Sequence, residues 1–263
     1  MPGADSVAHR GRRLAWPWFL VVVVAYLAVL KGAGAIVGVD TGASDSRFPT
    51  AESVVLSGLI PIGLSVLFAA AVVTWLGWWG QIVRYRVPVR AWVWCVPLSM
   101  TAAAILGMNY PNLVAQKASL VLALLAMAAC VGAAEELMFR GIGVQVFKRS
   151  GLSEGRTALY SSLVFGLVHL SNAFGEGSQA VLQAVIVSTS GYFFYLCLRA
   201  GGTLLLPVAV HALWDFGLIS NSVGEDPKSY PGVMLPILLQ VALIVLLIVR
   251  RRTIEPATAL TLR

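Results

Sequence analysis

Charged residues are scarce in this chain of 263 residues. Asp, Glu, Lys and Arg make up 12% of it, against roughly 25% in an average soluble domain. Hydrophobic residues account for 58%. A soluble fold of this size could not bury so much apolar material, so the shortage of charge excludes an ordinary soluble protein. It predicts an all-α, polytopic membrane bundle whose surroundings are the lipid bilayer.

Other features are missing as well. The three cysteines, Cys95, Cys130 and Cys197, lie inside apolar segments without CxxC or zinc-like spacing, which argues against a disulfide framework and favours small core residues. Internal repeats, low-complexity tracts and polar stretches longer than a loop are absent. We therefore expect residues 1–263 to form a single membrane domain, with a basic tail at 1–15 and a second tail at 250–263.

Eight apolar segments can be separated along the chain. A helix needs about 20 residues to cross the hydrocarbon core, so most of them are long enough to span it, while the fifth and seventh are short and must be buried, tilted or partly wet. The segments are approximately 14–37, 53–79, 91–108, 118–138, 157–171, 179–199, 203–220 and 231–249.

Basic residues alternate between the connecting segments. With the N-terminus placed in the cytoplasm, fifteen basic residues fall inside and three outside, which predicts eight spans with both termini cytoplasmic. The net charge of +7 is thereby explained without a nucleic-acid partner. The inside residues are Arg10, Arg12, Arg13, Arg84, Arg86, Arg90, Arg140, Lys148, Arg149, Arg156, Arg199, Arg250, Arg251, Arg252 and Arg263; outside lie Arg47, Lys117 and Lys228, with Asp40, Asp45, Glu52, Glu176, Glu225 and Asp226. Lys31 falls within the first span.

The first segment has a second interpretation. A basic start, an apolar run and the small residues KGAGA are also features of a cleavable signal peptide, so residues 1–35 could be removed. The apolar run is long for such a peptide. Cleavage would leave seven spans, and each remaining loop would keep its predicted side of the membrane.

Six ionisable side chains lie within or beside the apolar segments. Each costs about 2.5–3.5 kcal/mol at membrane depth even on a lenient scale, so each is a candidate functional residue. Pairs four residues apart share a helix face: Glu136 with Arg140 in EELMFR, and His211 with Asp215 in HALWD. In FGLVH the same spacing puts an aromatic ring, Phe165, beneath His169. The six are Glu135, Glu136, Arg140, His169, His211 and Asp215.

Each motif has a plainer interpretation. EExxxR could be the interfacial end of a helix with a solvated ion pair, and His169 could be an interfacial histidine. Depth is a further difficulty, because Glu135 would lie near the cytoplasmic end of its helix and His169 near the outer end of the next. The two can meet only if the fourth helix continues through GIGVQVFKR, or if the backbone is irregular around a wet cavity. Together, however, the three polar faces supply the parts of a hydrolytic site.

In the order EExxxR, FxxxH, HxxxN/D, the three motifs resemble those of the CPBP family of intramembrane proteases. That family includes type II CAAX prenyl endopeptidases and bacteriocin-processing or self-immunity proteins. The resemblance covers a core at about residues 118–220. It implies that Glu135 and His169 activate a water, that His211 and Asp215 stabilise the oxyanion, and that Glu136 and Arg140 are architectural, with Phe165 beside them.

Position 215 departs from the pattern, because prenyl-protease members usually carry Asn there. A protonated Asp215 could donate to an oxyanion, whereas an ionised one would repel it. The family is often labelled metalloprotease, which makes zinc on Glu135, His169 and His211 an option. The chain has no HExxH pair, and a metal-free glutamate mechanism is equally compatible with these residues.

The resemblance predicts an endopeptidase that cleaves a membrane-associated protein or peptide, with a prenylated CaaX tail as one candidate, in the cell membrane. Two other functions stay open at this point. A non-catalytic membrane partner, such as an immunity or scaffold protein, could keep the fold, although no motif residue is lost. A proton-coupled transporter would also use intramembrane Glu, His and Asp, but such transporters often contain repeats. The sequence does not indicate an oligomeric state.

Overall fold

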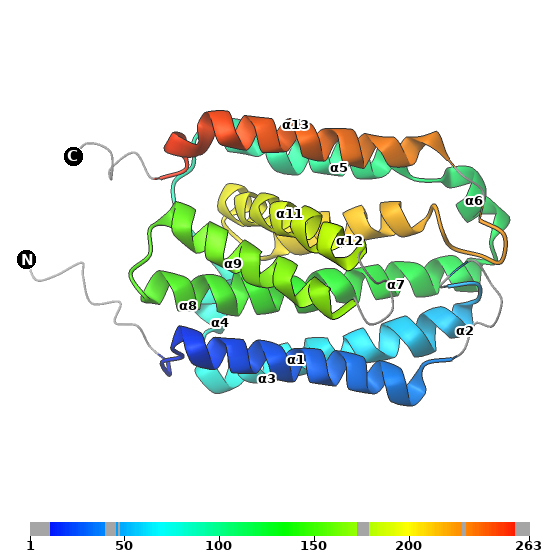
Figure 1. Ribbon diagram of the computed structural model, residues 1–263, viewed down its shortest axis with the longest axis horizontal. Helices are drawn as coiled ribbons and strands as arrows, with labels where there is room; N and C mark the ends of the chain where they lie inside the picture. The colour runs from blue at the N-terminus through cyan, green and yellow to red at the C-terminus, as the bar shows by residue number, and fades with distance from the viewer. Residues whose placement is uncertain (1–10, 40–45, 47, 173–178, 228–229, 256–263) are drawn as a thin grey trace, which may run out of the picture.

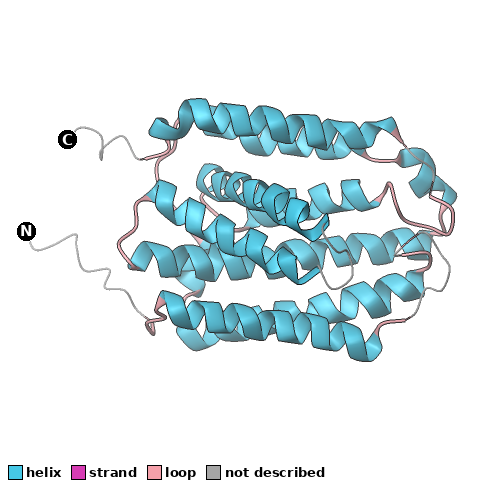
Figure 2. Ribbon diagram, in the orientation of Figure 1, coloured by secondary structure: helices cyan, strands magenta, loops and turns pink. Residues whose placement is uncertain are grey.

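A computed structural model describes residues 11–39, 46, 48–172, 179–227 and 230–255. Several residues in the sequence predictions lie outside these ranges: Arg10, Asp40, Asp45, Arg47, Glu176, Lys228 and Arg263. The described residues form helices and connecting loops without a strand (Figure 2). The α-helices are α1 Trp16–Val37, α2 Ala51–Val54, α3 Ile60–Leu76, α4 Trp79–Val83, α5 Cys95–Gly107, α6 Tyr110–Ala115, α7 Ala118–Glu135, α8 Val144–Arg149, α9 Glu154–Val168, α11 Gln179–Gly201, α12 Leu205–Ile219 and α13 Met234–Arg250.

Each of the eight predicted segments contains a helix. Among the described residues, five helical stretches are long and apolar enough to cross a membrane: Trp16–Val37, Ala51–Leu76, Ala118–Arg149, Gln179–Gly201 and Pro231–Thr253. Ala91–Gly107 and Leu205–Ile219 are shorter apolar helices. The all-helical class is thus confirmed, while eight crossings and the cytoplasmic placement of the termini stay predictions.

Two helix boundaries differ from the sequence prediction in a way that matters for the site. The fourth helix does not end near residue 138: a π-helical segment, Glu136–Gly143, joins α7 to α8 in one continuous stretch to Arg149. The fifth begins at Glu154 and ends in a 3-10 turn, His169–Asn172. A short turn joins α8 to α9. The distance of a residue along either helix can therefore be counted from that turn, at 1.5 Å per residue. Glu135 is then about 21 Å from the turn and His169 about 22 Å, which removes the depth difficulty.

The helices run back and forth between two ends of the bundle (Figure 1). At one end, the backbone N–H of Arg12 donates to the Leu76 carbonyl over 2.9 Å, and that of Tyr85 donates to the Gly202 carbonyl over 3.0 Å. At the other end, the Asn109 N–H donates to the Ser220 hydroxyl over 2.9 Å. The first end collects the described residues that were predicted to face the cytoplasm, apart from Arg140. We call it the basic end.

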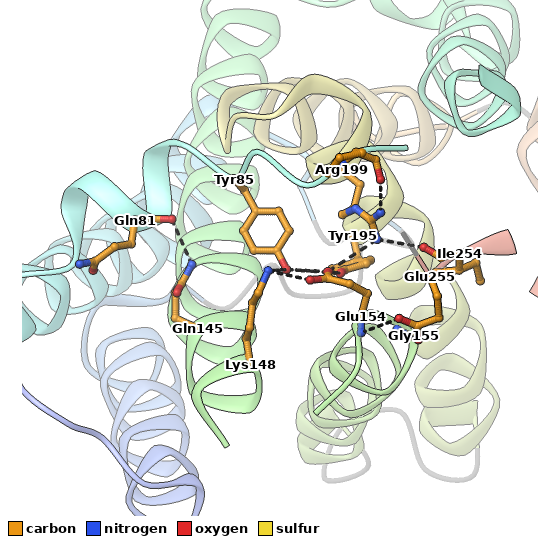
Figure 3. Close-up of polar contacts among 11 residues, drawn as sticks. Gln81, Tyr85, Gln145, Lys148, Glu154, Gly155, Tyr195, Arg199, Ile254 and Glu255 are labelled. Atoms are coloured by element: carbon orange, nitrogen blue, oxygen red, sulfur yellow. Dashed lines mark hydrogen bonds and ion pairs between the residues drawn. The ribbon is translucent and has the colours of Figure 1, made fainter. Parts of the chain in front are cut away.

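A buried polar cluster fastens the basic end together (Figure 3). The Glu154 carboxylate accepts from Tyr85 over 2.8 Å and from Lys148 over 2.6 Å, and also from Tyr195. Burial, and then the adjacent Glu154 carboxylate, raise the pKa of Tyr85 well above its usual value, so this phenol stays a donor. Arg199, which is almost fully buried, lies 3.6 Å from the same carboxylate. The cluster thus ties α8, α9 and α11 to the segment before α5.

The start of α9 is also capped. The Glu255 carboxylate accepts from the backbone N–H groups of Glu154 and Gly155, over 3.2 and 3.0 Å, where a negative charge suits the helix dipole (Figure 3). This contact joins the segment after α13 to α9. The contact holds the start of α9 at the basic end, and the length of α9 then sets how far His169 lies from that end.

The surface is apolar along the helices and aromatic at the basic end. Large hydrophobic side chains such as Leu67, Leu122 and Leu182 are more than half exposed, as lipid-facing residues would be. Five partly exposed tryptophans lie at helix ends near the basic residues: Trp16, Trp18, Trp75, Trp79 and Trp94. Tryptophan favours the membrane–water interface, so this end is suited to lie at the level of the lipid headgroups.

Candidate active site

A fully buried ion pair lies where α7 passes into the π-helical segment. The Nη1 of Arg140 is 3.0 Å from Oε1 of Glu136, and neither side chain has any exposure. The predicted pairing is therefore present, but it is neither solvated nor interfacial. Burying one of these charges alone would be very unfavourable. Glu136 and Arg140 therefore have to be treated as a unit.

Aromatic rings enclose the guanidinium. Arg140 lies over the ring of Phe165 at 4.2 Å and over that of Phe194 at 5.3 Å, both cation–π distances. Gly191 makes room for this arrangement, because a Cβ there would come within 2.9 Å of Phe165 and 3.0 Å of Arg140. Helix α11 therefore packs directly against the ion pair, a contact that the sequence motifs did not indicate.

Glu136 has a second partner, His211 of α12. Its Oε1 lies 2.7 Å from Nδ1 of His211. The imidazole stacks on Phe194, with ring centroids 4.2 Å apart and planes 15° apart. Helix α12 comes this close because residue 132 is glycine: a Cβ there would lie 2.7 Å from the Val208 carbonyl oxygen. Glu136, rather than Asp215 alone, therefore orients the His211 ring.

The other nitrogen of His211 faces two carboxylates. Its Nε2 is 3.6 Å from Oε2 of Glu135 and 3.6 Å from Oδ2 of Asp215. These are ion-pair distances and lie beyond hydrogen-bond range. The His211 side chain is only 5% exposed, whereas Glu135 is 15% and Asp215 24% exposed. His211 therefore links the buried ion pair to the two more accessible acids.

His169 is held differently. Its Nδ1 is 2.9 Å from the Phe165 carbonyl oxygen, and its ring lies edge-on to that of Phe165, with centroids 5.1 Å apart. A carbonyl can only accept, so Nδ1 carries the hydrogen, and in the neutral ring Nε2 keeps its lone pair. The backbone of its own helix thus prepares His169 to act as a base through Nε2.

Glu135 and His169 line the same cavity, of about 600 Å³. Its wall is built from α1, the second span, α7, the end of α9 and Ile219 at the end of α12. His211 and Asp215 are not among its lining residues, although both lie beside Glu135. Sequence reasoning did not place five other polar residues on this wall: Tyr26, Lys31, Ser57, Ser171 and Asn172. Lys31 donates to the Asn172 side chain over 2.6 Å.

The predicted zinc ligands do not form a metal cluster in the described part of the chain. Glu and His are suitable zinc ligands by chemistry, but within these residues no group of three or more His, Cys, Asp or Glu is arranged to hold a metal ion. Nδ1 of His211 is occupied by Glu136, and its Nε2 points between two carboxylates. The arrangement does not fit a Glu–His–His site, and zinc stays a prediction of the family resemblance.

Comparison with family models gives one match. Residues 117–217 match the family described as "Type II CAAX prenyl endopeptidase Rce1-like". The matched region runs from the start of α7 into α12 and contains all three motifs; α1, α3 and α5 lie outside it. Comparisons with curated proteins and with solved structures gave no match.

Proposed function

We propose that this chain, a multi-pass membrane protein carrying an Rce1-like domain of the CPBP membrane-protease family at residues 117–217, is an intramembrane endopeptidase. The observation that carries the proposal is the cavity wall shared by Glu135 and His169. A partly accessible carboxylate and an imidazole with a prepared Nε2 are the pair of bases that water activation needs. The family match supports CAAX-type protease activity in general, and the mechanism below is our proposal.

In the proposed reaction, water lies between Glu135 and His169. One of these bases takes a proton as the water oxygen attacks the scissile carbonyl carbon, and the carbonyl oxygen becomes negative. The proton then passes to the amide nitrogen as the C–N bond breaks, which gives a carboxylate and an amine. His211, fixed by Glu136, keeps Glu135 in place through Nε2. Following the family resemblance, His211 and Asp215 also remain candidates for stabilising the oxyanion.

The substrate is a peptide that reaches the cavity from the membrane. A volume of about 600 Å³ is in the range of sites that enclose a small ligand, so it suits a few residues of an extended peptide and not a folded domain. The apolar helix surfaces around it favour a substrate that is itself anchored in lipid. A prenylated CaaX peptide is one such substrate.

The direct test uses the full chain in proteoliposomes. We expect it to cleave at least one lipid-anchored peptide, with the same peptide lacking the anchor cleaved more slowly, and mass spectrometry of the products identifies the bond. A panel of a prenylated CaaX peptide, its unprenylated form and an unrelated transmembrane peptide separates CaaX recognition from general membrane anchoring. Intact peptides throughout would contradict an enzymatic function and favour the non-catalytic partner.

Metal dependence is a separate prediction. Because the described acids and histidines do not converge as a three-ligand set, we expect cleavage to persist after exhaustive chelation and desalting. Metal content is measured on the same sample by elemental analysis. Activity that disappears with the metal and returns with stoichiometric zinc would instead establish the Glu135, His169 and His211 zinc site that the resemblance suggests.

A further inference from the structure

A phenol from the first helix projects into the wall of the catalytic cavity. Tyr26 of α1 is 1% exposed and lines the cavity together with Glu135 and His169. Its ring packs edge-on against Phe139 in the π-helical segment, with centroids 6.3 Å apart. Its hydroxyl is buried and has no hydrogen-bond partner among the described residues.

An unpartnered buried hydroxyl needs an explanation. Such a group loses its bonds to water on folding and gains nothing in return, so it is unfavourable, and native proteins contain few of them. Phenylalanine would keep the ring packing without this cost, and Phe19 of the same helix is buried in this way. The hydroxyl of Tyr26 therefore has no role in folding that the described structure reveals.

The chemistry of the proposed site needs hydrogen-bond donors beside the scissile carbonyl, and Tyr26 lies on the wall of the same cavity as Glu135 and His169. Attack on a carbonyl makes its oxygen negative, and hydrogen-bond donors fixed near that oxygen stabilise the transition state. Glu135 can accept but not donate when ionised. His211 and Asp215, the donors that the family resemblance suggests, do not themselves line the cavity, so a donor on its wall would act in addition to them. On the wall, Lys31 donates to Asn172 and Asn172 donates to Gln183, so these two polar groups are already engaged.

We propose that the hydroxyl of Tyr26 is a further catalytic residue, which donates a hydrogen bond to the scissile carbonyl oxygen as its negative charge develops. The inference rests on the proposed hydrolase function. Tyr26 keeps its proton throughout, so the proton balance between water, Glu135, His169 and the leaving amine is unchanged. Because α1 lies outside the matched region, the first span supplies an active-site group to the Rce1-like domain.

The test is Tyr26→Phe, which removes one oxygen atom and keeps the ring. Loss of a single oxyanion donor lowers kcat by about 10²–10³-fold, and we expect this loss with KM nearly unchanged. We expect the midpoint of thermal unfolding in detergent to stay the same or rise, because no existing hydrogen bond is removed. Tyr160→Phe, on the partly exposed face of α9, is the matched control and should behave like the unaltered protein.

The outcomes separate the two proposals. Lower kcat with an unchanged or higher unfolding midpoint supports a catalytic hydroxyl. If Tyr26→Phe cleaves as fast as the unaltered chain, the inference is wrong while the hydrolase function stands. A parallel fall in activity and in the unfolding midpoint also overturns it, because the hydroxyl would then be structural. If the unaltered chain and Tyr26→Phe both leave every peptide intact, the function fails and this inference fails with it.

Discussion

We expect that replacing Glu135 by Gln abolishes measurable cleavage while the protein stays folded. Gln keeps the shape of the side chain but cannot take a proton from water, and loss of a general base lowers kcat by about 10²–10⁴-fold. The Glu135 side chain is 15% exposed, and its closest charged contact, with His211, is 3.6 Å long. Little of the fold depends on it, so we expect an unchanged unfolding midpoint and unchanged detergent-solubilised yield.

The measurement is the single-turnover rate on the best peptide of the panel, with Glu225→Gln as the control. Glu225 is exposed in the loop between α12 and α13 and does not line the cavity, so the same chemical change is made outside the proposed site. An undiminished rate in Glu135→Gln would remove Glu135 from the mechanism. A biological effect that survives this variant although peptide cleavage is lost would favour the scaffold function instead.

Local sequence patterns were sufficient to predict most of the helices. Long apolar runs and basic loops each reflect whether lipid or water surrounds that segment. Both can therefore be recognised from the sequence of the segment alone. The spacings in EELMFR and HALWD also predicted which side chains share a face, and both pairs are present in the structure. Residues of all three motifs lie against one another, because Phe165 contacts Arg140, His169 and His211, while the catalytic roles of the motif residues stay predictions.

Contacts between distant helices could not be predicted in the same way. Glu136 and His211 are 75 residues apart, and their contact depends on Gly132 allowing α12 to approach α7. The fourth helix continues through GIGVQVFKR, which the sequence left open as one option. The charge of Arg140 alone suggested a helix end, but an ion pair and two aromatic rings make this residue compatible with burial. Tyr26 gave no signal at all, since one tyrosine in an apolar span is typical of lipid-facing sequence.

The buried ion pair leads to the second large effect. Removing one partner of a buried pair leaves an uncompensated charge, which costs about 3–5 kcal/mol. We expect Arg140→Met to lose about that much stability in a denaturant titration of the detergent-solubilised protein, because the Glu136 side chain has no exposure and would lose its guanidinium partner. Arg156→Met is the control: Arg156 is exposed on α9, and a substitution on the surface away from packed features changes stability by about 0.5 kcal/mol at most.

The double variant Glu136→Gln with Arg140→Met separates the two roles of Glu136. It carries no unpaired charge, so much of the stability lost in Arg140→Met should return. Activity should not return, because the neutral amide introduced by Glu136→Gln cannot hold the imidazole of His211 as the carboxylate does across 2.7 Å, and His211 then no longer fixes Glu135. A stable and active double variant would show that Glu136 is purely architectural. A double variant as unstable as Arg140→Met would show that the pair is not the source of the loss.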